Sequence, residues 1–65
     1  MANVKVGDKF IVTSRWEGLA QGTKFVVINE ENSFLYGSTW EISIIDSTKI
    51  LRVEHKYFND GVMKI

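Results

Sequence analysis

Apolar and polar residues alternate along most of the chain, which is the pattern of β-strands with one face turned toward a core. Two early runs, KFIVT (9–13) and TKFVVIN (23–29), are also dense in β-branched and aromatic residues. The consecutive apolar residues of the second run predict a central strand covered on both faces, or one bent sharply between two sheets. Three later runs complete a set of five predicted strands, TWEISII (39–45), ILRVEHKYF (50–58) and VMKI (62–65).

Polar and turn-forming residues separate the predicted strands. EENS (30–33) is interpreted as a polar loop, DSTK (46–49) as a short hairpin loop, and NDG (59–61) contains an Asp-Gly pair of the kind favoured in tight turns. The only helical candidates are single turns near residues 16–21 and 56–60. Short strands at this spacing, without any proline, predict an all-β fold. The expected architecture is a small five-stranded antiparallel barrel, with a curled five-stranded β-meander as the alternative.

The chain is short enough to be a single domain, spanning residues 1–65. It has no cysteine and one histidine, so neither a disulfide nor a metal site is available to stabilise it. Apolar side chains must therefore form the core, and 45% of the residues are hydrophobic. Their period-two placement predicts a core of Phe10, Val12, Phe25, Val27, Trp40, Ile42, Ile44, Leu51 and Val53.

The order of strands and loops resembles the Src-homology-3-like small barrel over nearly the whole chain. VKVGDKFIV (4–12) resembles the opening strand, SRWEGLAQG (14–22) the long first loop and EENSFLYGS (30–38) the second loop. DST (46–48) matches the distal hairpin, and HKYFND (55–60) the helical turn before the last strand. The resemblance is one of pattern only. The Ala-Leu-Tyr-Asp-Tyr run and the proline of the peptide-binding members are absent, so their preference for proline-rich peptides is not implied.

Trp40 shows where the resemblance and the periodicity differ. In peptide-binding members of this family, a tryptophan that begins the third strand lines the peptide groove. Here Trp40 shares a strand face with Ile42 and Ile44. Periodicity therefore favours an inward-facing core residue over a groove residue.

Charge and composition exclude several functions. The net charge is zero, from eight basic and eight acidic residues, which argues against a dedicated nucleic-acid-binding protein. No segment approaches the roughly 20 apolar residues needed to span a bilayer, so no membrane partner is expected and the protein is expected to be cytoplasmic. Nucleophilic catalysis would depend on the single His55 as a base, and no clustered metal ligands or glycine-rich phosphate loop are present. We expect no enzyme activity, cofactor or metal.

Aromatic residues in or beside the predicted loops are the candidate contacts for a partner. Trp16, Phe34, Tyr36 and Tyr57 occupy positions that no strand period requires. They could plug the open ends of a small barrel, or form one patch if the first loop, second loop and final turn lie on the same side. We favour Trp16 as a contact, since Leu19 could plug the core instead. The predicted partner-binding residues are Arg15, Trp16, Glu17, Tyr36 and Tyr57.

The expected function is that of a small binding module that modulates a protein partner as an accessory or regulatory factor. Small inhibitors of host proteins are frequent in bacteriophage genomes, which suggests a phage origin. A monomer is expected rather than a dimer. The alternative is a small barrel of the KOW type that binds nucleic acid, with Lys49, Arg52 and Lys56 beside Tyr57 as its contacts.

Overall fold

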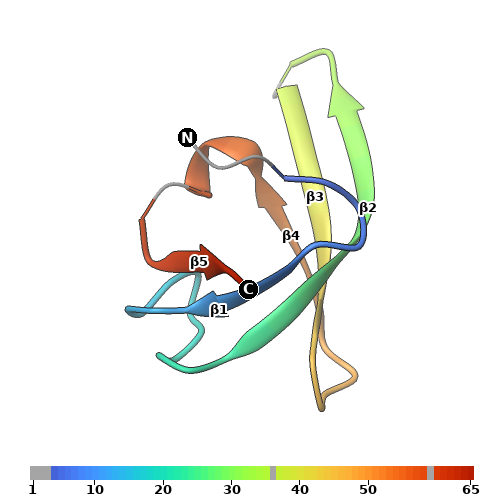
Figure 1. Ribbon diagram of the computed structural model, residues 1–65. Helices are drawn as coiled ribbons and strands as arrows, with labels where there is room; N and C mark the ends of the chain where they lie inside the picture. The colour runs from blue at the N-terminus through green and yellow to red at the C-terminus, as the bar shows by residue number, and fades with distance from the viewer. Residues whose placement is uncertain (1–3, 36, 59) are drawn as a thin grey trace.

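The computed structural model describes residues 4–35, 37–58 and 60–65, and its fold is all-β, as predicted (Figure 1). The strands are β1 (Lys9–Val12), β2 (Lys24–Ser33), β3 (Gly37–Ile44), β4 (Ile50–Glu54) and β5 (Val62–Lys64). A short 3-10 helix, η1 (His55–Tyr57), lies between β4 and β5.

The five strands form one antiparallel sheet in the order β4-β3-β2-β1-β5. The first four strands make a meander, and β5 returns to pair with β1. Figure 1 shows the sheet curling, so that β1 and β5 lie to one side of β3 and β4 and run at a steep angle to them. Within the described residues no pairing joins β4 to β5, so the sheet curls around its core without closing. The open, curled sheet is consistent with the curled-meander alternative, except that β5 pairs with β1 and not with β4.

β2 is the strand that bends between the two halves of the sheet. Its first residues pair with β1, with Phe25 opposite Phe10, and the strand then continues along β3. The register with β3 shifts between Val27 and Asn29, which leaves Ile28 in a bulge. A bulge bends its strand and increases the local twist. Ile28 is exposed, so of the two interpretations of this apolar run the bent strand is the one observed.

The core contains every residue predicted for it. Eight of the nine predicted residues are buried, and Leu51 packs against them half-buried. Three further buried residues are Trp16, Leu19 and Phe58. Phe10 stacks on Phe25 at 5.4 Å between ring centroids and meets the edge of Phe58 at 5.5 Å. Among the described residues, no buried side-chain nitrogen or oxygen lacks a hydrogen-bond partner.

Two predicted strand boundaries are wrong. The EENS run (30–33) is not a loop but the end of β2, paired with β3 from Trp40 to Gly37. Glu30 lies opposite the core residue Trp40, and beyond this pair no described residue of the hairpin is buried, so the hairpin there needs no apolar side chains. The fourth strand ends at Glu54 and not at residue 58, because the chain turns into η1. A helical turn within 55–60 is what the family resemblance implied.

Candidate interaction surface

Trp16 lies inside the core, so the prediction that it is an exposed contact residue is wrong. Its side chain is 6% exposed. The indole stacks on Phe25 at 5.2 Å between ring centroids and meets Phe58 edge-on at 5.3 Å. Its Nε1–H donates a hydrogen bond to the Tyr57 carbonyl at 2.7 Å, which satisfies the only polar group of the ring. Trp16 is the lid of the core.

The loop that carries Trp16 is closed by a tight turn. The backbone N–H groups of Trp16 and Leu19 each donate to the other residue's carbonyl, at 3.1 and 2.7 Å. Between them Glu17 and Gly18 both have positive φ, 48° and 78°, as a two-residue type I′ turn requires. The turn holds Trp16 and Leu19 against the core. Of the predicted contacts in this loop, Arg15 and Glu17 alone remain exposed.

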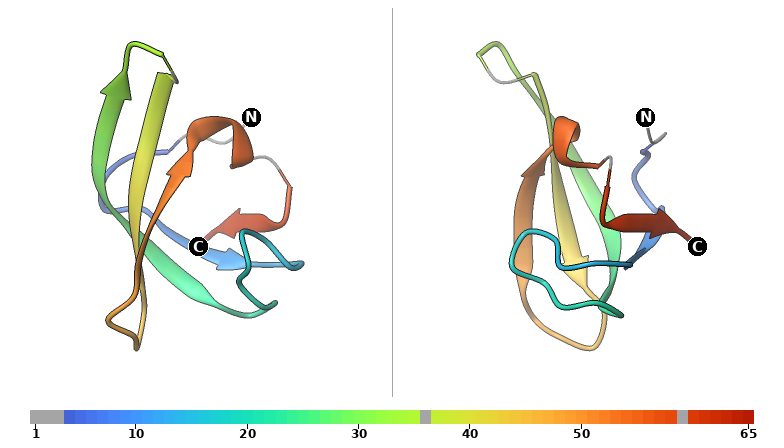
Figure 2. Two further views of the ribbon diagram at one scale, coloured as in Figure 1. Left: turned by 180° about the vertical axis from the view of Figure 1, so that it is seen from behind. Right: turned by 90° about the vertical axis from the view of Figure 1, so that its left-hand side faces the viewer.

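The predicted contact residues do not gather on one face. Tyr57 in η1 is 45% exposed, with the Lys56 ammonium 5.2 Å from the centroid of its ring. Tyr36 lies outside the described residues. Figures 1 and 2 show the loop that carries Trp16 and the turn between β2 and β3 at opposite ends of the molecule. The expected face of first loop, second loop and final turn is therefore not formed.

The most exposed large apolar side chains lie at the end of the β2–β3 hairpin. Phe34 is 103% exposed and Leu35 is 78% exposed. We call residues 29–35 and 37–41 the arm, and Phe34 with Leu35 the tip. In both views of Figure 2 the arm projects past η1 and the rest of the sheet. The Leu35 backbone N–H donates to the Ser33 hydroxyl at 3.2 Å, which orders the turn at the tip.

The tip was only partly visible in the sequence. Phe34 stood out as a loop aromatic, but it was not among the predicted contacts, and Leu35 was not considered. The reason is the interpretation of residues 30–33 as a loop, which hid the continuation of the hairpin beyond the core. The sequence pattern that marks the tip is a short apolar run, Phe34-Leu35-Tyr36, with Asn32 and Ser33 before it and Gly37 and Ser38 after it. Phe34 and Leu35 cannot reach the core from the end of a long hairpin.

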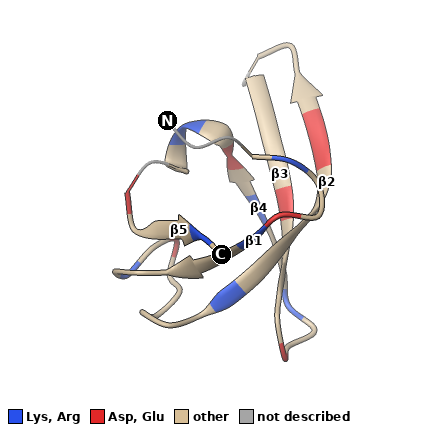
Figure 3. Cartoon of the chain, in the orientation of Figure 1, with Lys and Arg blue, Asp and Glu red and all other residues tan. Residues whose placement is uncertain are grey.

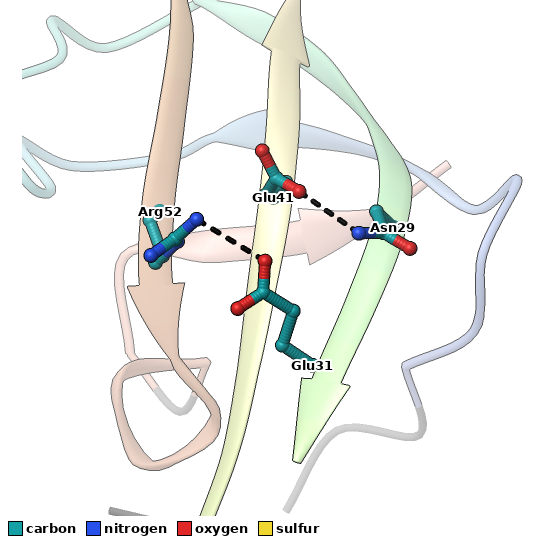
Figure 4. Close-up of polar contacts among 4 residues, drawn as sticks. All are labelled: Asn29, Glu31, Glu41 and Arg52. Atoms are coloured by element: carbon teal, nitrogen blue, oxygen red, sulfur yellow. Dashed lines mark hydrogen bonds and ion pairs between the residues drawn. The ribbon is translucent and has the colours of Figure 1, made fainter. Parts of the chain in front are cut away.

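Polar contacts join the strands on the outward face at the base of the arm (Figure 4). Asn29 Nδ2 donates to Glu41 Oε1 at 2.9 Å, and the Arg52 guanidinium lies 3.1 Å from Glu31 Oε1. Both contacts are exposed, so each contributes no more than about 1 kcal/mol to the free energy of folding. A shallow hollow lies beside them, lined by Glu31, Asn32, Ser33, Thr39, Arg52 and Glu54.

The arm is acidic. Residues 29–41 contain Glu30, Glu31 and Glu41 and neither lysine nor arginine. Figure 3 shows this acidic charge on the upper part of β2 and on β3. The nearest described cation in an ion pair with the arm is Arg52 of β4, which offsets one carboxylate. The arm therefore presents an apolar tip on an acidic stalk.

The side chains that could serve catalysis or metal binding are His55 and the acidic residues. His55 is half-buried, and its Nδ1 accepts a hydrogen bond from Trp40 Nε1–H at 3.1 Å. The described part of the chain holds no group of three histidine, cysteine or acidic residues placed to bind a metal ion. None of its helices is long and apolar enough to cross a membrane.

Comparisons with protein-family models, curated proteins and solved structures find no match for the chain. Neither a family's residue pattern nor a relative's activity therefore bears on these surfaces. The exposed arm and the distribution of charge around it are the features from which a function can be argued.

Proposed function

We propose that the chain is a small non-catalytic binding module that acts as an accessory or regulatory factor on a protein partner, with the arm tip as its main contact. The observation that carries the proposal is the exposure of Phe34 and Leu35, 103% and 78%, on a hairpin that projects beyond the core. Burying such a side chain contributes about 1.5–3 kcal/mol. The two side chains stay in water when the chain folds. Their burial in an apolar pocket of a partner would therefore contribute this free energy to binding.

The charges on the arm favour a protein over a membrane or a nucleic acid as the occupant of the tip. Glu30 and Glu31 precede the tip in β2, with Asn32 and Ser33 between them and Phe34, and residues 29–41 contain no lysine or arginine. Carboxylates repel the phosphates of anionic lipids and of nucleic acids. A protein pocket with apolar walls could bury Phe34 and Leu35, and a polar or basic rim around it would face the carboxylates of the arm.

We also propose that the fold is Src-homology-3-like. The strand order and the 3-10 turn directly before the last strand support this proposal. The peptide groove of that family is not part of it. Trp40, which would line such a groove, is 4% exposed and bonded to His55.

Replacement of the tip tests the proposed function. The double variant Phe34→Ser/Leu35→Ser should fold as stably as the parent, because these side chains bury nothing within the chain. It should lose partner binding by about 2 kcal/mol or more, which is roughly 30-fold. The measurement is affinity capture from the source organism with the parent protein, followed by titration of the captured protein with each variant.

The matched control is Ile50→Ser, which removes a 54% exposed apolar side chain at the start of β4, away from the arm. It should bind the captured protein like the parent. Equal affinity of the tip variant and the parent would refute the tip as the contact. An equal loss in the control would indicate nonspecific apolar adhesion.

The KOW-like alternative is less well supported, because two of its three cations have acidic partners. Arg52 lies 3.1 Å from Glu31, and the Lys56 ammonium lies 3.3 Å from Glu54. The hydrogen bond to Glu54 raises the pKa of Lys56, because the carboxylate stabilises the charged ammonium. Of the three proposed contacts, only Lys49 has no carboxylate partner among the described ion pairs.

We therefore expect weak, nonspecific binding of DNA and RNA, with a dissociation constant of about 10⁻⁴ M at physiological salt. Phosphate contacts dominate such binding and require available cations. Fluorescence anisotropy with labelled single- and double-stranded oligonucleotides measures it. Micromolar binding that persists above about 0.2 M salt would favour the KOW-like alternative.

A further inference from the structure

The outward face of the β5–β1–β2 half of the sheet is apolar and carries lysines. Side chains alternate between the two faces of a strand, and Phe10, Val12, Phe25 and Val27 point into the core. Their neighbours Lys9 and Ile11 on β1, and Lys24 and Val26 on β2, therefore point outward. Met63 lies opposite Ile11, and the Ile65 backbone N–H donates to the Lys9 carbonyl at 2.9 Å. We call this surface the lysine face, formed by Lys9, Ile11, Lys24, Val26, Met63 and Ile65.

Much of this surface is open to solvent. Met63 and Ile65 are each 56% exposed, both lysines are exposed, and Ile11 and Val26 are half-buried. The register places Ile11 between Met63 and Lys24 in one row across three strands. Aliphatic side chains thus lie beside ammonium groups on one side of a three-stranded sheet.

Among the described residues, no acidic residue occupies an outward position on β5, on β1 or on the part of β2 that pairs with β1, residues 24–26. The nearest carboxylate along the chain is that of Asp8, directly before β1, and its partner Lys64 lies opposite the inward-facing Phe10 in the register. Asp8 pairs with the Lys64 ammonium at 3.0 Å, and this hydrogen bond lowers the pKa of Asp8. The charges of Lys9 and Lys24 therefore have no carboxylate partner among the described ion pairs.

We propose that the lysine face binds an anionic membrane surface. Lys9 and Lys24 would meet the lipid headgroups while Met63, Ile65 and Ile11 reach into the interface. Lysine suits this position because its stem packs on apolar surface while its ammonium reaches the headgroups. Although the net charge is zero, the charge is unevenly placed (Figure 3). The acidic arm belongs to the other half of the sheet, so an anionic surface would orient the molecule with the lysine face toward it.

The composition of this face favours lipid over a protein or nucleic acid. Protein interfaces are enriched in aromatic residues and depleted in lysine, whereas this face has two lysines and no aromatic residue. Single-stranded nucleic acid is usually held by aromatic stacking, which this face cannot supply. The sequence-based expectation of no membrane partner rested on the absence of a spanning segment. Binding at a membrane surface needs only apolar side chains and nearby cations.

Vesicle co-sedimentation with the full chain tests the proposal. We expect binding to phosphatidylcholine vesicles that contain about one third phosphatidylserine, and none to pure phosphatidylcholine. The double variant Lys9→Gln/Lys24→Gln should weaken binding about 25-fold, since each lysine near such a surface contributes roughly fivefold. The control Lys49→Gln/Lys56→Gln removes the same charge from residues outside the face, and it should bind like the parent.

Three outcomes would overturn the proposal. The first is no binding to the anionic vesicles at millimolar lipid. The second is an equal loss in the two double variants, which would indicate nonspecific attraction of charge. The third is a loss with Phe34→Ser, which would place the contact at the tip. Circular dichroism verifies that each variant is folded. We expect the spectra to match that of the parent, because the substituted lysines are all exposed. Oligonucleotide binding that the face variant weakens equally would make nucleic acid the ligand and would also reject the proposal.

Discussion

Replacing Trp16 by alanine should destabilise the protein by about 3–5 kcal/mol. The substitution removes the indole that stacks on Phe25 and meets the edge of Phe58, and it leaves a cavity in a core of few residues. It also removes the N–H that satisfies the Tyr57 carbonyl. A domain of this length has a total stability of about 3–10 kcal/mol. The variant should therefore be largely unfolded near room temperature, as measured by urea denaturation monitored by circular dichroism.

Two further variants separate the packing of Trp16 from its hydrogen bond. Trp16→Phe keeps a ring against Phe25 and Phe58 but loses the donor to the Tyr57 carbonyl, and an unsatisfied partner costs about 1–3 kcal/mol. Tyr57→Ala removes a half-exposed side chain and keeps the carbonyl, so it should cost about 1 kcal/mol or less. A Trp16→Ala protein within about 1 kcal/mol of the parent would mean that the indole is not part of the core.

The stability effect also decides how binding experiments should be designed. A contact residue can be replaced without unfolding the protein, and Trp16 cannot. Loss of partner binding in Trp16→Ala would report unfolding and not a lost contact. Phe34 and Leu35 are suitable probes because the chain itself buries neither side chain.

The core strands could be predicted because their packing is periodic. Phe10 and Val12, or Ile42 and Ile44, are two positions apart with one residue between them, and burial on one face of a sheet demands that spacing. The prediction failed where burial depends on contacts distant in the sequence. Trp16 is held by the Tyr57 carbonyl, 41 residues away, and no local period records that contact. Phe58 is buried for the same reason, after η1 has ended the alternation of β4.

The candidate surface was less predictable than the core, because no packing constraint acts on it. The arm is a strand pair held by backbone hydrogen bonds, and these do not depend on apolar side chains. Its polar sequence therefore looks like a loop. The lysine face has a different problem: alternation with Phe10 and Val12 already leaves Ile11 outward, but only the register shows that Met63 lies beside it on the same face. The bulge at Ile28 divides β2 into two parts: the part before it carries Lys24 and Val26 of the lysine face, and the part after it belongs to the arm.

Gly61 offers a second test of the packing around Trp16. Its φ is +91°, a conformation that side chains rarely adopt, and its carbonyl accepts the Thr13 backbone N–H at 2.8 Å. A Cβ at Gly61 would lie 3.2 Å from Trp16 Cδ1 and 3.4 Å from the Ser14 carbonyl oxygen. Gly61→Ala therefore combines an unfavourable backbone conformation, about 1–2 kcal/mol, with overpacking, about 1–3 kcal/mol.

Gly22→Ala is the matched control for Gly61→Ala. Gly22 has nearly the same φ, +92°, but a Cβ there would meet nothing within 4 Å. It should cost only the backbone part, about 1–2 kcal/mol. Thermal and urea unfolding of the two variants should therefore differ by the overpacking against Trp16. Equal destabilisation would show that the indole moves aside at no cost. In Trp16→Phe the difference between the two alanine substitutions should shrink but not vanish, because the Cβ of residue 16 and the Ser14 carbonyl oxygen would still lie 3.3 and 3.4 Å from the Cβ at Gly61.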